Sequence, residues 1–138
     1  MPNRLFVDSN IWVYLFSAED SLKQQRAKQY LATHENTDTL IISYQVINEV
    51  SKVLLNKGFI EEDIRELIQY LIKTCIVQDY SKDIVLLASN LRERYSFSFW
   101  DSQISASAVT AQCGLLISED MQDGLNVDGT VIRNIFKD

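Results

Sequence analysis

Short apolar runs alternate with helix-like segments along this chain, and this alternation constrains its fold more than any other feature. We expect strands at residues 5–7, 40–42, 75–77 and 115–117, with a last strand within 131–136. The segments between them predict helices at residues 20–33, 44–56, 61–73, 81–94 and 98–112. This β-α-β order predicts a three-layer α/β/α fold with a mostly parallel central sheet of four to five strands.

Length and composition are consistent with a single domain spanning residues 1–138, because 46% hydrophobic content is ample for one core. The chain has no apolar stretch near the roughly 20 residues that span a bilayer and no signal-peptide core, so we expect a cytoplasmic protein. Cys75 and Cys113 lack metal-ligand spacing, which predicts buried, reduced thiols. The single histidine, His34, excludes a His-rich metal site.

The formal net charge of −6 argues against nucleic-acid binding through the electrostatics of the whole surface. This argument does not apply to one local site. Divalent metal ions can bridge carboxylates to phosphates, with basic side chains gathered at the rim. The position of the acidic residues therefore matters more than their number.

Acidic residues follow two of the expected strands. Residues 5–7 run directly into Asp8, and residues 115–117 run into the segment Ser118-Glu119-Asp120. In parallel sheets the carboxyl ends of strands open into the crevice where ligands bind. Capping of the next helix is an alternative explanation for each of these polar turns.

Two more acidic residues lie on expected helices. Asp101 falls near the middle of a helical face otherwise made of small and apolar residues, which are Ile104, Ser105, Ala108 and Ala111. A capping box with Ser98 explains a carboxylate in the first turn but does not require it to point inward. Glu49 lies at the edge of an apolar arc, where a surface position is the favoured interpretation if the residue is taken alone.

The predicted topology can bring Asp8, Glu49, Asp101 and Asp120 to one edge of the sheet. Four carboxylates within a few ångström repel one another, so such a cluster needs a counter-ion. Mg²⁺ or Mn²⁺ prefers oxygen ligands and keeps several waters, which suits a partly open acidic ring. A bound water could then act as a nucleophile on a phosphoryl group.

The residues around these acids resemble the successive motifs of the PIN domain. The motifs are Phe6-Val7-Asp8-Ser9-Asn10, Ile42-Ser43-Tyr44-Gln45-Val46-Ile47-Asn48-Glu49, Ser98-Phe99-Trp100-Asp101 and Leu116-Ile117-Ser118-Glu119-Asp120. Their order and spacing cover nearly the whole chain and resemble, more narrowly, the VapC-type toxins of type II toxin-antitoxin systems. The resemblance implies a Mg²⁺- or Mn²⁺-dependent endoribonuclease that cuts tRNA or rRNA loops, forms a homodimer and is inhibited by a VapB-like antitoxin.

The same resemblance implies roles for individual acidic residues. Asp8 and Asp101 would be the main metal ligands. Glu49 and Asp120 would complete the catalytic acidic ring, directly or through water.

Three further residues in these motifs have supporting roles by the same resemblance. Asn10 and Ser118 would orient the carboxylates from beside them. The last motif is unusually acidic, so Glu119 and Asp120 could exchange roles.

Basic and aromatic residues near the motifs allow two interpretations. The basic residues could form a rim that faces the phosphates, but a solvated helix face is the favoured interpretation. These residues are Lys23, Arg26, Lys28, Lys52 and Lys57. Trp100 could stack on a base. Residue statistics favour a core position for this tryptophan.

Three alternatives to a toxin remain open at this point. A receiver-like signalling domain has the same alternation, with Asp79 after the third strand as phosphoacceptor, but it leaves Glu49 and Asp101 unexplained. A non-toxin PIN nuclease that processes RNA and a catalytically idle PIN binding module share the fold and the motifs.

Overall fold

The protein is described here by a computed structural model that covers residues 3–137. Its strands are β1 (Arg4–Val7), β2 (Thr39–Ser43), β3 (Ile76–Gln78), β4 (Leu115–Ile117), β5 (Asn126–Val127) and β6 (Thr130–Arg133). Its helices are α1 (Ser9–Phe16), α2 (Ser21–His34), α3 (Tyr44–Asn56), α4 (Glu61–Thr74), α5 (Lys82–Arg94) and α6 (Phe99–Thr110).

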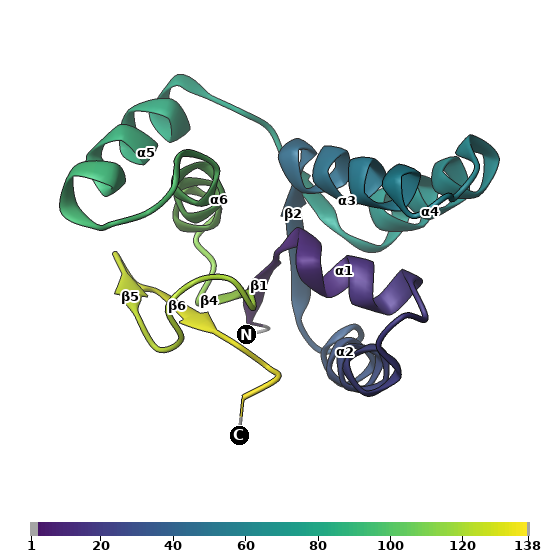
Figure 1. Ribbon diagram of the computed structural model, residues 1–138. Helices are drawn as coiled ribbons and strands as arrows, with labels where there is room; N and C mark the ends of the chain where they lie inside the picture. The colour runs from purple at the N-terminus through teal and green to yellow at the C-terminus, as the bar shows by residue number, and fades with distance from the viewer. Residues whose placement is uncertain (1–2, 138) are drawn as a thin grey trace.

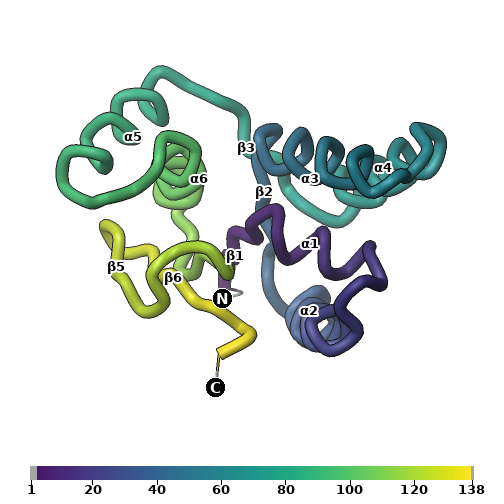
Figure 2. Tube along the Cα trace, viewed as in Figure 1, coloured from purple at the N-terminus to yellow at the C-terminus, as the bar shows by residue number. Residues whose placement is uncertain are grey.

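The six strands form one sheet in the order β3-β2-β1-β4-β6-β5, and all neighbours are parallel except β5 and β6. The mostly parallel α/β architecture is confirmed, with one strand more than expected because β5 and β6 form a short hairpin. Figure 1 shows α1 to α4 on one side of the sheet and α5 and α6 on the other. In Figure 2 the chain crosses between these sides after β3, through residues 79–81.

Helix α1 is the main element that the apolar pattern does not predict. Its sequence, SNIWVYLF, is apolar on every side after its first turn, so it has no amphipathic period. The helix lies between α2 and α3, and Trp12 within it is fully buried. Trp12 Nε1 donates to Val7 O at 3.2 Å, which fixes α1 to the end of β1.

Helix α6 packs against the sheet through its small residues. Ile104, Ser105, Ala108 and Ala111 are all buried, as their shared face predicts. Small side chains allow the helix backbone to approach the strands closely, and α6 packs against β2 and β4.

The remaining structural expectations concern the cysteines and membrane insertion. Cys75 and Cys113 are buried and unpaired thiols, as expected. Within residues 3–137, none of the helices combines the length and the apolar character needed to cross a bilayer.

Candidate metal-dependent active site

Asp8 is the most deeply buried acidic side chain of the candidate site, with 4% of its surface exposed. It follows β1 and caps α1, since its Oδ1 accepts a 2.7 Å hydrogen bond from Ser9 N. Its Oδ2 accepts a 2.8 Å hydrogen bond from Ser118 Oγ. Burial raises the Asp8 pKa to about 7, an effect that these two hydrogen bonds oppose and the charges of Glu49 and Asp101 reinforce.

Asn10 and Ser118 connect Asp8 with Asp120. Asn10 Nδ2 donates to Asp120 Oδ2 at 2.9 Å and approaches Ser118 Oγ at 3.5 Å. Ser118 Oγ also accepts a 3.3 Å hydrogen bond from Asp120 N. Both residues therefore lie where they can orient the carboxylates at the ends of β1 and β4, as the sequence motifs suggest.

Glu49 projects from the second turn of α3, which begins directly after β2 because Ser43 caps it through Val46 N. Burial raises its pKa, and the nearby charges of Asp101 and Asp120 raise it further. The side chains of Gln45 and Ser9 favour its charged form, yet its buried Oε1 has no hydrogen-bond partner. A buried carboxylate oxygen without a partner is costly unless a cation or water reaches it.

Asp101 occupies the first turn of α6 and is half-buried. Ser98 Oγ accepts from Asp101 N at 3.1 Å, so the N-cap expected at this position is present. Burial raises the Asp101 pKa, the Ser98 hydroxyl lowers it and the Asp120 charge raises it again. Capping by Ser98 and proximity of Asp101 to the other acids therefore coexist.

The structure brings the four expected acids into electrostatic contact: the charges of Glu49 and Asp101 act on Asp8, and that of Asp120 acts on Glu49 and Asp101. Among residues 3–137, no three acidic, histidine or cysteine side chains are grouped tightly enough to enclose a metal ion by themselves. A looser arrangement fits Mg²⁺ or Mn²⁺, because these ions keep several waters and use few protein ligands directly. The unpartnered Glu49 Oε1 and the buried Asp8 are oxygen ligands of the required kind.

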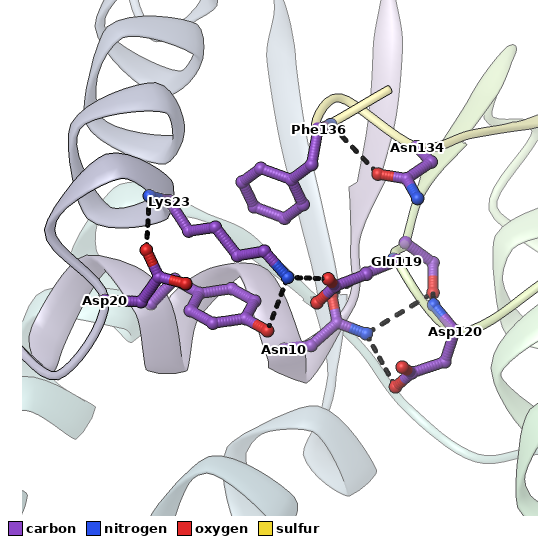
Figure 3. A network of polar contacts seen from close by, with 9 residues as sticks. Asn10, Asp20, Lys23, Glu119, Asp120, Asn134 and Phe136 are labelled. Carbon is purple, nitrogen blue, oxygen red and sulfur yellow. Dashed lines mark hydrogen bonds and ion pairs between the residues drawn. The ribbon is translucent and has the colours of Figure 1, made fainter. Parts of the chain in front are cut away.

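Glu119 is held apart from this cluster by an ion pair with Lys23 of α2 (Figure 3). Lys23 Nζ also donates to Tyr14 OH at 3.2 Å and lies 5.3 Å from the centre of the Phe136 ring. Asp120, by contrast, is bonded to Asn10 in the same view. The geometry therefore favours Asp120 over Glu119 as the fourth acidic residue.

Most of the basic residues suggested as a phosphate rim have other partners. Lys57 forms an ion pair with Glu19, and Arg26 Nε donates to Ile135 O at 2.9 Å. Lys23 is occupied by Glu119. Lys52, in contrast, lines a cavity that Glu49 also lines.

This cavity, which we call the α3 pocket, has a volume of about 680 Å³. Its lining residues are Ser9, Gln45, Asn48, Glu49, Lys52, Val53, Asn56, Tyr80 and Trp100. The expected core position of Trp100 is wrong, because 57% of its surface is exposed in this pocket. It is the second residue of α6, where the helix begins.

Gln45 and Tyr80 belong to the α3 pocket, and the sequence reasoning assigned them no role. Gln45 lies inside the second motif, but the apolar pattern of the helix gives no indication that its side chain is buried. Tyr80 lies in the connection between β3 and α5, where sequence gives no geometry. The neighbouring Asp79, considered above as a phosphoacceptor, follows the edge strand β3 and is exposed.

Comparison with known proteins identifies a sequence family. The family model described as "PIN domain" matches residues 5–122. No curated protein matches the chain significantly.

Solved structures with a similar fold come from three organisms. The Mycobacterium tuberculosis toxin VapC20, described as cleaving the sarcin-ricin loop, is 21% identical, with a TM-score of 0.67 over 81% of this chain and 86% of that one. A toxin-antitoxin complex from Klebsiella pneumoniae gives 24% identity and a TM-score of 0.71, covering 92% and 95%. VapBC2 from Rickettsia felis, bound to a DNA fragment from its promoter, gives 15% identity and a TM-score of 0.73, covering 95% and 98%.

Proposed function

The chain belongs to the PIN domain family, and we propose that it is a Mg²⁺- or Mn²⁺-dependent endoribonuclease of the VapC toxin type. The observation that carries this proposal is the grouping of four carboxylates, one of which is the deeply buried Asp8. Within residues 3–137, none of the four forms an ion pair with a basic side chain. The pKa of Asp8 is raised to about 7, and Glu49 retains a buried oxygen without a partner. A divalent cation would remove both costs.

In this proposal Asp8 and Asp101 hold the metal, and Glu49 and Asp120 complete the ring directly or through water. A bound divalent ion supplies Lewis-acid stabilisation of phosphoryl charge and lowers the pKa of a water ligand. The chain's own residues set the geometry. Ser118 holds one oxygen of Asp8, and the Ser9 amide holds the other.

Asn10 has the corresponding role for Asp120. Its amide nitrogen donates to the carboxylate, while its oxygen accepts from Glu119 N at 3.3 Å. The nitrogen and the oxygen of the Asn10 amide therefore both bind the segment Glu119-Asp120, and together they hold it in place. Residues that orient ligands in this way are expected to matter nearly as much as the ligands.

RNA is the proposed substrate because the similar fold of VapC20 belongs to a toxin that cleaves the sarcin-ricin loop. A tRNA or rRNA loop presents unpaired bases and a bent backbone that an acidic protein can bind through a metal and a few local contacts. The similar toxin-antitoxin complexes support a VapB-like antitoxin as protein partner. We further propose a homodimer that acts in the cytoplasm.

The test is cleavage of total cellular RNA by purified wild-type protein with Mg²⁺ or Mn²⁺ and with EDTA, with the cut ends mapped. Asp8→Asn is the inactivating variant, and Asp79→Asn is the matched control because Asp79 is an exposed aspartate that also follows a strand. We expect discrete cuts that require metal and Asp8 but not Asp79. Cuts that persist in Asp8→Asn would indicate a contaminating nuclease.

Absence of both cleavage and Mn²⁺ binding in the wild type would contradict the catalytic proposal and leave a PIN binding module. Metal-dependent cleavage without growth arrest when the protein is overproduced would instead indicate a non-toxin RNA-processing nuclease. Growth arrest that depends on Asp8 would support the toxin assignment.

A further inference from the structure

We propose that the α3 pocket binds one unpaired nucleobase of the RNA next to the cleaved phosphate, between Trp100 and Tyr80. The inference rests on the proposed nuclease function and adds the determinant of sequence preference to it. Its basis is the position of the pocket beside the acidic cluster, the side chains that line it and the hydrogen bonds within its wall.

Position is the first reason. Glu49 lines the pocket and also belongs to the acidic cluster, and Ser9, which follows Asp8, lines the pocket as well. A nucleotide in the pocket would therefore have its neighbouring phosphate within reach of the four carboxylates. The volume of about 680 Å³ lies within the roughly 300–1,000 Å³ range of small-ligand sites.

The lining suits a nucleobase. Trp100 and Tyr80 expose 57% and 47% of their surfaces, and aromatic faces are the usual stacking partners of unpaired bases. Asn48 and Asn56 are exposed residues of α3, and each side-chain amide offers donors and an acceptor for a base edge. Lys52, between them in sequence, supplies a positive charge for the backbone.

Gln45 bonds the Tyr80 hydroxyl and the main-chain carbonyl of Trp100. Its Nε2 donates to Trp100 O at 3.3 Å, and its Oε1 accepts from Tyr80 OH at 3.0 Å. Gln45 itself is only 7% exposed, so both ends of its amide are fixed inside the pocket wall. A preformed site loses less entropy on binding than a flexible one, which favours selective recognition.

Fluorescence provides a direct test, because Trp12 is fully buried and Trp100 is exposed. The four nucleoside monophosphates and short single-stranded oligoribonucleotides are titrated into the protein in EDTA, so that binding is measured without cleavage. Stacking on Trp100 should quench its emission, with one base preferred. Trp100→Phe should abolish this signal.

Affinities are then compared by anisotropy of labelled oligonucleotides. Trp100→Ala and Tyr80→Ala should each weaken binding about fivefold or more. Tyr44→Ala is the matched control, since Tyr44 is 48% exposed but does not line the pocket. In cleavage of total RNA with Mn²⁺, Trp100→Ala should relax the base preference at one position beside the cut, with Mn²⁺ affinity unchanged.

Cleavage by the wild type without quenching by any nucleotide would overturn the nucleobase site and leave the nuclease proposal intact. Unchanged affinity and unchanged cut sites in Trp100→Ala and Tyr80→Ala would also overturn it, and would leave the pocket as a surface for a protein partner. Base-selective quenching without any cleavage would support the pocket while the nuclease proposal fails.

Discussion

Ser118 Oγ donates a 2.8 Å hydrogen bond to Asp8 Oδ2 and accepts hydrogen bonds from Asp120 N and Asn10 Nδ2. A hydroxyl has one donor and two acceptor positions, so Ser118 uses all of them within the acidic cluster. The contact joins the carboxyl ends of β4 and β1, which are neighbouring parallel strands. One hydroxyl group therefore sets the relative position of two candidate catalytic acids.

Ser118→Ala should weaken Mn²⁺ binding by roughly 10- to 100-fold, the usual effect of losing a residue that orients a ligand. Isothermal titration calorimetry measures this affinity directly. Ser89→Ala, which changes an exposed serine of α5, is the control and should bind Mn²⁺ like the wild type. Equal affinities for both variants would show that Ser118 does not support the metal site.

The stability of the metal-free protein should fall as pH rises from about 4 to about 7. Folding raises the Asp8 pKa from 3.8 to about 7, so the folded state binds the proton more tightly than the unfolded state over this range. Protonated Asp8 favours the folded state at low pH, and this contribution is lost as Asp8 ionises. A shift of this size corresponds to on the order of 4 kcal/mol at neutral pH and above.

Urea denaturation in EDTA can test this pH dependence. Asp8→Asn should be more stable than the wild type at pH 8, and the two should be nearly equal at pH 4. Glu49 and Asp101, whose pKa values are also raised, are present in both proteins and largely cancel in the comparison. A stability difference that is the same at both pH values would contradict the assigned cause.

Mn²⁺ should raise the melting temperature of the wild type at pH 8, because an ion that binds only the folded state stabilises it. The increase should be much smaller in Asp8→Asn. Differential scanning calorimetry with and without EDTA measures both effects. An equal increase in the two proteins would place the ion elsewhere.

Asp120→Asn should reduce RNA cleavage by more than the roughly 10- to 100-fold expected for a supporting residue. Glu119→Gln should leave most of the activity, since Glu119 is bound by Lys23 rather than by the acidic cluster. Initial rates with Mn²⁺ distinguish the two variants. Greater loss in Glu119→Gln would reverse the assignment of the fourth acid.

Ala108→Leu should destabilise the protein by about 1–3 kcal/mol, because Ala108 is a fully buried residue of α6 and a larger side chain would not fit there. The displaced helix should also carry Asp101 away from the other acids and weaken Mn²⁺ binding. Thr110→Leu is the control, an exposed position at the end of the same helix. Lower stability with unchanged Mn²⁺ affinity would separate this packing from the site.

The sequence was sufficient for the sheet and for most helices because their apolar residues recur with a clear period. Helix α1 lacks such a period, since α2 and α3 cover it on opposite sides and leave no polar face. Strand β5 has only two residues, Asn126 and Val127, and exists through its pairing with β6. Neither element carries a local signal that sequence reasoning can detect.

The placement of the acidic residues was predictable where their position along an element decides it. Asp8 follows a strand, and Asp101 shares a face with small residues, so their placement follows from the fold. The choice between Glu119 and Asp120 depends on Lys23, which is distant in sequence. Lys23 forms an ion pair with Glu119, and Asp120 is left beside the acidic cluster. The exposure of Trp100 likewise depends on the tertiary surroundings of the first turn of α6, which residue statistics cannot reveal.

The acids of the site come from widely separated parts of the chain, and Ser118 reaches Asp8 only after β4 has paired with β1. During synthesis on a ribosome, Asp8 and Glu49 emerge long before Asp101, Ser118 and Asp120. Under the proposed function, a nascent chain that has not yet reached β4 would lack the complete acidic cluster and would not cleave RNA before its synthesis is nearly finished. Stalled chains that end before Leu115 should accordingly show no Mn²⁺-dependent cleavage.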